Sequence, residues 1–165
     1  HYIDKKVEKS LLDEMLSAAN LAPSWKNSQT PRFYVATGEK SKNAVREALP
    51  EFNRKNSENA SAYIVTTVVL NRSGFDKDGT AVTEIGNGWG YYDLGLNNMA
   101  LLLKATELGI STLVMGIRDG EKLRKEFDIP ETEAVVSVIA VGYTDSEIVR
   151  PKRKSVEDFA KFYEE

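Results

Sequence analysis

A loop between residues 22 and 33 holds the densest set of side chains that could bind a small molecule. Its sequence, APSWKNSQ over residues 22–29, includes Ser24, Asn27 and Gln29. Hydroxyl and amide groups donate and accept hydrogen bonds, as the polar edge of a heterocycle requires. Proline, serine and asparagine are also typical of ordinary turns, so composition alone leaves a plain structured turn open as the alternative.

Cysteine is absent from the chain, and the single histidine is His1. The lack of cysteine excludes disulfides, thiolate nucleophiles, iron–sulfur clusters and cysteine-bound zinc. A lone histidine at position 1 is a poor general base for a serine-hydrolase triad and a poor metal ligand, so we expect no metal site. Demanding chemistry would therefore need carboxylates, lysine, tyrosine or a bound organic cofactor.

Size and charge narrow the class of protein further. A chain of 165 residues can bury one compact core, so we expect a single domain over residues 1–165. The net charge of -3 gives no electrostatic case for nucleic acid as a partner, and no apolar run is long enough for a membrane helix. The absence of cysteine and of a secretory signal pattern fits a cytoplasmic protein.

Four segments together resemble the nitroreductase family. The first is the loop, whose pattern A-P-S-x-x-N-x-Q-x-P-x-F is similar to the family signature, except that Thr30-Pro31 replaces Pro-Trp. The others are residues 93–116, 129–143 and 153–157. Each match is weak alone, but together they extend over nearly the whole chain.

The resemblance implies an α+β fold with a mixed, largely antiparallel central sheet flanked by helices in three layers. It also implies a homodimer with FMN in a groove formed by both subunits. Hydride would pass from NAD(P)H through flavin N5 to a nitro, quinone or similar acceptor in a ping-pong cycle, so no side chain would be catalytic in its own right. The alternatives are a flavin-binding module without turnover and a relative that fragments flavin or removes halogens.

The same resemblance assigns two groups of residues to the cofactor site. Ser24 and Asn27 would meet the flavin across the dimer interface, supported by the rest of their loop. A second group would lie along the ring, where a glycine lets a backbone N–H approach flavin N5 or O4 closely. The first group is Pro23, Ser24, Asn27 and Gln29, and the second is Leu113, Met115 and Gly116.

Two further polar residues are candidates at the edges of the cofactor. Asn53 could bind the pyrimidine edge of the flavin, although an asparagine at a solvated helix end is the alternative. Arg153 matches the family's C-terminal arginine that pairs with the FMN phosphate, against the alternative of a solvated basic tail. An Arg-Arg-Ser-x-Arg run that holds the phosphate in the family would precede His1 and is not in this sequence. Either that run has been removed or the chain binds flavin weakly, and we expect removal.

Aromatic side chains gather just before the most apolar stretch of the sequence. Trp89, Tyr91 and Tyr92 are candidates for a substrate wall that would stack on nitroaromatic or quinone acceptors. The alternative is a set of core aromatics. The polar excursion over residues 71–84 has no hydrophobic period and is a candidate lid.

Periodicity predicts the elements that must position these residues. Helices are predicted over residues 9–21 (amphipathic), 41–49 (short and polar), 91–108 (buried) and 121–127, and residues 155–163 could form a last helix. Strand patterns cover residues 32–37, 62–70 and 134–141, and residues 111–115 are expected to form a short strand or an extended loop. Helices and strands are interleaved along the chain, but they do not alternate regularly, and the glycine fingerprint of a nucleotide-binding fold is missing. A doubly wound nucleotide fold is therefore not expected.

Overall fold

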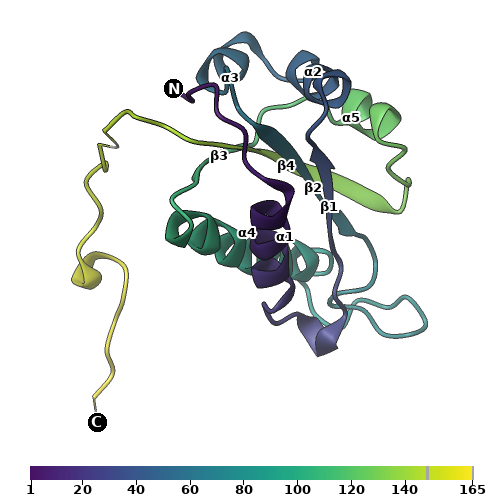
Figure 1. Ribbon diagram of the computed structural model, residues 1–165. Coiled ribbons are helices and arrows are strands. Elements are labelled where there is room, and N and C mark those ends of the chain that lie inside the picture. The colour runs from purple at the N-terminus through teal and green to yellow at the C-terminus, as the bar shows by residue number, and fades with distance from the viewer. Residues whose placement is uncertain (148, 165) are drawn as a thin grey trace.

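The computed structural model describes residues 1–147 and 149–164, which form one four-stranded sheet with helices on both faces (Figure 1). The helices are α1 (Lys9–Asn20), η1 (Trp25–Asn27, a 3₁₀ turn), α2 (Glu39–Glu47), α3 (Glu51–Asn56), α4 (Gly88–Glu107), α5 (Gly120–Glu126) and η2 (Val156–Asp158, a 3₁₀ turn). The strands are β1 (Pro31–Ala36), β2 (Ala62–Val69), β3 (Ser111–Met115) and β4 (Glu133–Gly142).

The strands lie in the order β1-β2-β4-β3, and each neighbouring pair is antiparallel. Strand β2 is buried along its length except at Val69, because it lies inside the sheet with helices over both faces. Its β-branched residues suit such a strand. The expected α+β fold with a largely antiparallel sheet is confirmed.

Two hydrophobic cores lie on the two faces of the sheet. Alternate residues of β2 supply them, since successive side chains of a strand point to opposite faces. Ile64 packs in one core with residues of α1 and α4, such as Met15 and Leu101. Tyr63 packs in the other core with residues of α2 and α5, including Leu123. The expected three layers are therefore present.

The longest helix, α4, has 20 residues and begins at Gly88, before the predicted boundary. Its buried residues, which include Leu94, Leu101 and Ala105, recur at three- and four-residue spacings and line one side. The opposite side exposes Met99 and Leu103. None of the helices in the described part of the chain is long and apolar enough to cross a membrane.

The other predicted elements are confirmed to within a few residues, apart from two differences. Helix α3 was not predicted, because six residues are too few to show a helical period. The predicted helix over residues 155–163 is wrong, since only the short turn η2 forms there. Phe159 and Phe162 are exposed in this segment, and a short helix without packing is marginal in water. In Figure 1 the chain after β4 runs away from the sheet and helices.

Candidate functional site

The loop of residues 22–29 has an unusual backbone. Lys26, Asn27 and Gln29 adopt φ of 46°, 55° and 48°, which non-glycine residues rarely do. The Ser24 hydroxyl oxygen accepts a hydrogen bond from the Gln29 backbone N–H at 3.0 Å and closes the loop. Such a conformation persists only where its surroundings fix it, and strained loops of this kind cluster at binding sites.

Asp93 of α4 holds the loop in place through hydrogen bonds. Asp93 is only 2% exposed, and its carboxylate accepts hydrogen bonds from the Trp25 backbone N–H, at 3.1 and 3.2 Å, and from the Ser73 hydroxyl. One buried carboxylate of α4 therefore connects that helix to the loop of residues 22–29 and to the polar excursion of residues 71–84. The sequence signal for this residue was an aspartate near the start of the longest predicted helix, and sequence reasoning gave it no role.

Three aromatic rings pack against one another beside the loop. The Trp25 and Trp89 ring centroids lie 4.8 Å apart, and those of Trp89 and Tyr92 lie 5.8 Å apart. The Trp89 indole N–H donates to the Thr83 hydroxyl at 2.8 Å, so Trp89 is held by the excursion. Of the three predicted wall residues, Tyr91 and Tyr92 are exposed, whereas Trp89 supports the loop. Trp25 belongs to this cluster but was not singled out from the sequence.

The excursion itself is closed at its ends. Backbone N–H of Asn71 donates to the side-chain oxygen of Asn87 at 2.7 Å, and the Asn87 amide returns a bond to the Asn71 side chain at 2.9 Å. Lys26 of the loop approaches Asp76 of the excursion at 3.5 Å. The excursion therefore lies against the loop.

A second group of predicted residues meets at the end of β3. Asn53 is 9% exposed in α3, and its amide nitrogen donates to the backbone oxygen of Ile117 at 3.0 Å. This bond places Asn53 beside Gly116. The side chains of Met115 and Leu113 pack into the core under α2 and α5, so these residues can offer a ligand mainly their backbone.

The surface around Gly116 is open and apolar. A Cβ built on Gly116 would meet nothing within 4 Å, so packing within the chain does not require glycine at this position. Phe52 and Ile117 are each 74% exposed. A buried amide, an open glycine and exposed apolar side chains together suit the approach of a flat heterocycle with one polar edge.

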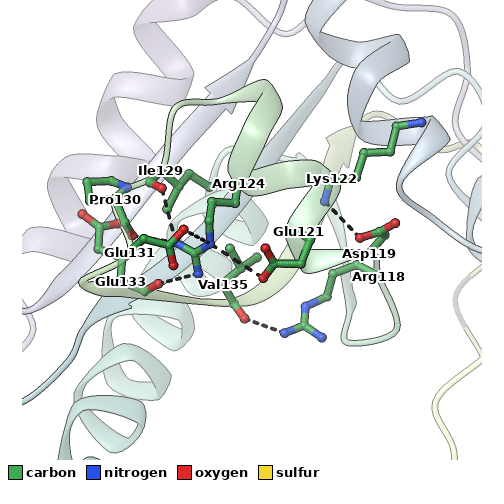
Figure 2. A network of polar contacts seen from close by, with 10 residues as sticks. All are labelled: Arg118, Asp119, Glu121, Lys122, Arg124, Ile129, Pro130, Glu131, Glu133 and Val135. Atoms are coloured by element: carbon green, nitrogen blue, oxygen red, sulfur yellow. Dashed lines mark hydrogen bonds and ion pairs between the residues drawn. The ribbon is translucent and has the colours of Figure 1, made fainter.

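A polar network fixes the segment that follows Gly116 (Figure 2). Arg118 donates to the Val135 backbone oxygen, and Asp119 caps α5 by accepting from the Lys122 N–H at 3.0 Å. Arg124 binds the backbone oxygens of Pro130 and Glu133 at 2.6 and 2.9 Å. These bonds tie the start of α5 and the turn before β4 to the sheet, which sets where Gly116 lies.

The two groups of residues lie apart within one chain. The loop leads into β1 and Gly116 follows β3, and these strands form opposite edges of the sheet. Three strand spacings separate those edges, which is roughly 14 Å. Figure 1 shows the segment after β3 on the side of α3 and α5, and the loop near α1 and α4. Arg153 belongs to neither group, since it lies exposed in the segment after β4 and bonds only to the nearby Pro151 oxygen at 3.4 Å in the described structure.

A cavity of about 410 Å³ opens beside the loop, between the end of α1, the start of β1 and α4. Its wall includes Arg32, Arg72, Asn97 and loop residues Ser24 and Gln29. Sequence reasoning did not identify this cavity, because its residues come from five separate segments.

Comparisons with known proteins agree with this architecture. The model of the nitroreductase family matches residues 1–143, so the chain belongs to the nitroreductase family. It is 27% identical over 153 residues, 88% of this chain and 79% of the relative, to an Archaeoglobus fulgidus protein provisionally named an NADH dehydrogenase/NAD(P)H nitroreductase.

Solved structures of the family share the fold. A nitroreductase family protein from Streptococcus pneumoniae TIGR4 has a TM-score of 0.83 at 22% identity, covering 99% of this chain and 94% of that one. An FMN-dependent nitroreductase from Clostridium difficile R20291 has a TM-score of 0.70 at 26% identity, covering 96% of this chain and 87% of that one.

Proposed function

We propose that this chain is an NAD(P)H-dependent FMN oxidoreductase that reduces nitro, quinone or similar acceptors in a ping-pong cycle. Family membership supports the class of enzyme. The Clostridium difficile neighbour is described as FMN-dependent, and the name of the Archaeoglobus relative includes NAD(P)H. We further propose a cytoplasmic location, on the absence of cysteine.

The single observation that carries the proposal is the open glycine beside a buried amide. Gly116 has free space where a side chain would lie, and Asn53 is held next to it by its bond to Ile117. That bond uses one amide hydrogen of Asn53, which has a second hydrogen and a carbonyl oxygen for another partner. The residues present therefore fit a flavin ring whose pyrimidine edge alternates donors and acceptors.

The residues of this chain would bind and orient the cofactor. Asn53 would read the pyrimidine edge, the backbone at Gly116 would approach the ring, and Arg153 would pair with the phosphate. When bound, FMN supplies two-electron chemistry, taking hydride at N5 from NAD(P)H and giving it to the acceptor. Tyr91 and Tyr92 offer exposed rings on which an aromatic acceptor could stack.

The loop would serve the flavin of a second copy, so we also propose a homodimer. Within one chain, Ser24 and Asn27 are on the far edge of the sheet from Gly116. Helix α4 exposes an apolar stripe of Tyr92, Met99 and Leu103, each more than half exposed. A copy packed on this stripe would bury apolar surface and could carry its own loop to the Gly116 group.

A titration with FMN followed by anaerobic addition of NADH or NADPH tests the proposed function. We expect FMN to bind, its visible absorbance to bleach on addition of the nucleotide, and the absorbance to return with a quinone or nitro compound. Protein that binds no FMN would contradict the proposal. If bound FMN stays oxidised under excess nucleotide but is bleached by dithionite, the result would support the alternative of a flavin-binding module without turnover.

A further inference from the structure

The cavity beside the loop is cationic. Arg32 and Arg72 line it, and no carboxylate does so in the part of the chain that the structure describes. Neither arginine takes part in any of the ion pairs among the described residues. Asp93 lies one turn before the lining residue Asn97, but its oxygens already accept from the Trp25 N–H and the Ser73 hydroxyl. The charge of the two guanidinium groups is thus left uncompensated by the lining.

The guanidinium group of Arg32 is fixed in place by the loop itself. One terminal nitrogen donates to the backbone oxygens of Gln29 and Pro31, at 2.7 and 2.8 Å. The other terminal nitrogen and Nε have no role in those bonds. An arginine held in this way loses less freedom when it binds a phosphate or carboxylate through its remaining donors.

Neutral polar groups complete the wall. The buried hydroxyl oxygen of Ser28 has no hydrogen-bond partner among the described residues. Asn97, which is 7% exposed, also lines the cavity, and its amide nitrogen donates to the Asp93 backbone oxygen at 3.3 Å. A buried polar atom without a partner costs free energy, which a ligand group at that place would recover. The volume of about 410 Å³ lies within the roughly 300–1,000 Å³ of small-molecule sites.

We propose that this cavity binds the anionic group, a phosphate or a carboxylate, of a small molecule used by the enzyme, with Arg32 and Arg72 as the charged contacts. The inference rests on the proposed function, because Ser24 and Gln29 belong both to the cavity wall and to the loop assigned to the flavin. The anion has two possible sources: the diphosphate of NAD(P)H or a carboxylate on the acceptor.

The test compares charged and neutral substrates in Arg32→Gln, Arg72→Gln and the double variant. Lys125→Gln is the matched control, since it removes one exposed cation from α5 on the other side of the sheet. The donors are NADH and 1-benzyl-1,4-dihydronicotinamide, which has no phosphate. The acceptors are 4-nitrobenzoate and the neutral 4-nitrobenzyl alcohol. FMN affinity is measured for every variant.

We expect the double variant to raise KM for one anionic substrate by about tenfold, the effect of losing one charge-assisted hydrogen bond. The KM for NADH rises if the cavity binds the diphosphate of the nucleotide, and the KM for 4-nitrobenzoate rises if the cavity binds the carboxylate of the acceptor. KM for the two neutral substrates, kcat and FMN affinity stay within about twofold, as they do in the control. Equal effects on charged and neutral substrates, no effect on either, or loss of FMN from the arginine variants would overturn the proposal.

A binding measurement separates this inference from the proposed function. Pyrophosphate and benzoate are titrated by calorimetry into wild type and the double variant, with FMN present or, if none binds, without it. Weaker binding of one probe to the double variant than to Lys125→Gln supports the anion site even where the flavin proposal fails. Identical titration curves for wild type and the double variant contradict the anion site even where the flavin is bound and reduced.

Discussion

Gly109 adopts a φ of +70° where α4 ends, and a Cβ built there would meet no atom within 4 Å. Gly116 has equally free space but no positive φ. An alanine at residue 109 would therefore be strained by its backbone, whereas at residue 116 it would be strained by neither backbone nor neighbours. If Gly116→Ala weakens FMN binding, neither backbone strain nor a clash within the chain accounts for the loss.

These two glycines give a matched pair of substitutions. Gly116→Ala should leave the free energy of unfolding within about 0.5 kcal/mol of wild type and weaken FMN binding. Gly109→Ala should lower the free energy of unfolding by about 1 kcal/mol and leave FMN affinity unchanged. Urea denaturation and fluorescence titration with FMN measure both quantities. The assignment of Gly116 to the flavin is wrong if Gly116→Ala binds FMN as wild type does.

Asp93 is the second residue whose substitution is informative, because it holds the loop from a buried position. Asp93→Ala leaves the Trp25 N–H and the Ser73 hydroxyl without their acceptor, which should lower the free energy of unfolding by about 1–3 kcal/mol. The chain has two tryptophans, Trp25 and Trp89, and both lie in this cluster, so the tryptophan emission spectrum should also shift.

Ser73→Ala is the control for Asp93→Ala, since it removes one donor and keeps the bonds to Trp25. We expect a smaller loss of stability and little spectral shift. An emission spectrum of folded Asp93→Ala identical to that of wild type would show that Asp93 does not position the loop.

At the scale of elements, the exposed stripe of α4 predicts the state of association. Met99→Lys combined with Leu103→Lys places two charges on the surface proposed to meet a second copy, and burying an unpaired charge is costly. The double variant should sediment as a monomer and lose FMN affinity, while Asn43→Lys, at an exposed position of α2, should stay dimeric. A double variant that remains dimeric would assign the interface to another surface.

How far the sequence could predict the elements depended on packing. The apolar spacing of α1 and the β-branched run of β2 are local signals, and both elements formed within a residue or two of the prediction. The failed helix at residues 155–163 had a helical pattern, but its large apolar side chains, such as Phe159 and Phe162, are exposed in the described structure. Helix α3 was missed because its six residues are too few to show a helical period, and its bond from Asn53 to Ile117 joins residues 64 positions apart.

The candidate site was predictable only in part, for a similar reason. The residues of the loop and Gly116 could be found because they lie in contiguous motifs. The role of Asp93 depends on segments 68 and 20 residues away along the chain. The cationic cavity likewise brings together Arg32 and Arg72, whose proximity no local pattern could reveal.

At the scale of the whole molecule, a buried carboxylate links three strands. Glu133 of β4 is 6% exposed and accepts from the Tyr34 hydroxyl of β1, at 2.9 Å, and from the Thr67 hydroxyl of β2. Burial, and then the hydrogen bond and the negative charge of Glu133, raise the pKa of Tyr34 to about 12. Burial raises the pKa of Tyr63 as well.

The raised pKa of Tyr34 predicts how stability depends on pH. The protonated phenol is the form that the fold favours, so its contribution is complete below the unfolded pKa of about 10 and is lost as pH rises toward about 12. Urea denaturation should show the free energy of unfolding falling from pH 8 to pH 11.5. This fall should be shallower in Tyr34→Phe than in wild type or in the control Tyr163→Phe, which changes an exposed tyrosine. Parallel curves for Tyr34→Phe and wild type would exclude this contribution.

The central claim is that each flavin site is built from the loop of one copy and the Gly116 group of another. Variant A, Ser24→Ala with Asn27→Ala, damages the loop, and variant B, Asn53→Ala with Gly116→Val, damages the other half. Each alone should bind little FMN. Mixed in equal amounts, unfolded together and refolded, they should recover about a quarter of the wild-type sites, because half of the dimers are mixed and each has one intact site. A mixture that binds no more FMN than the separate variants would contradict the account.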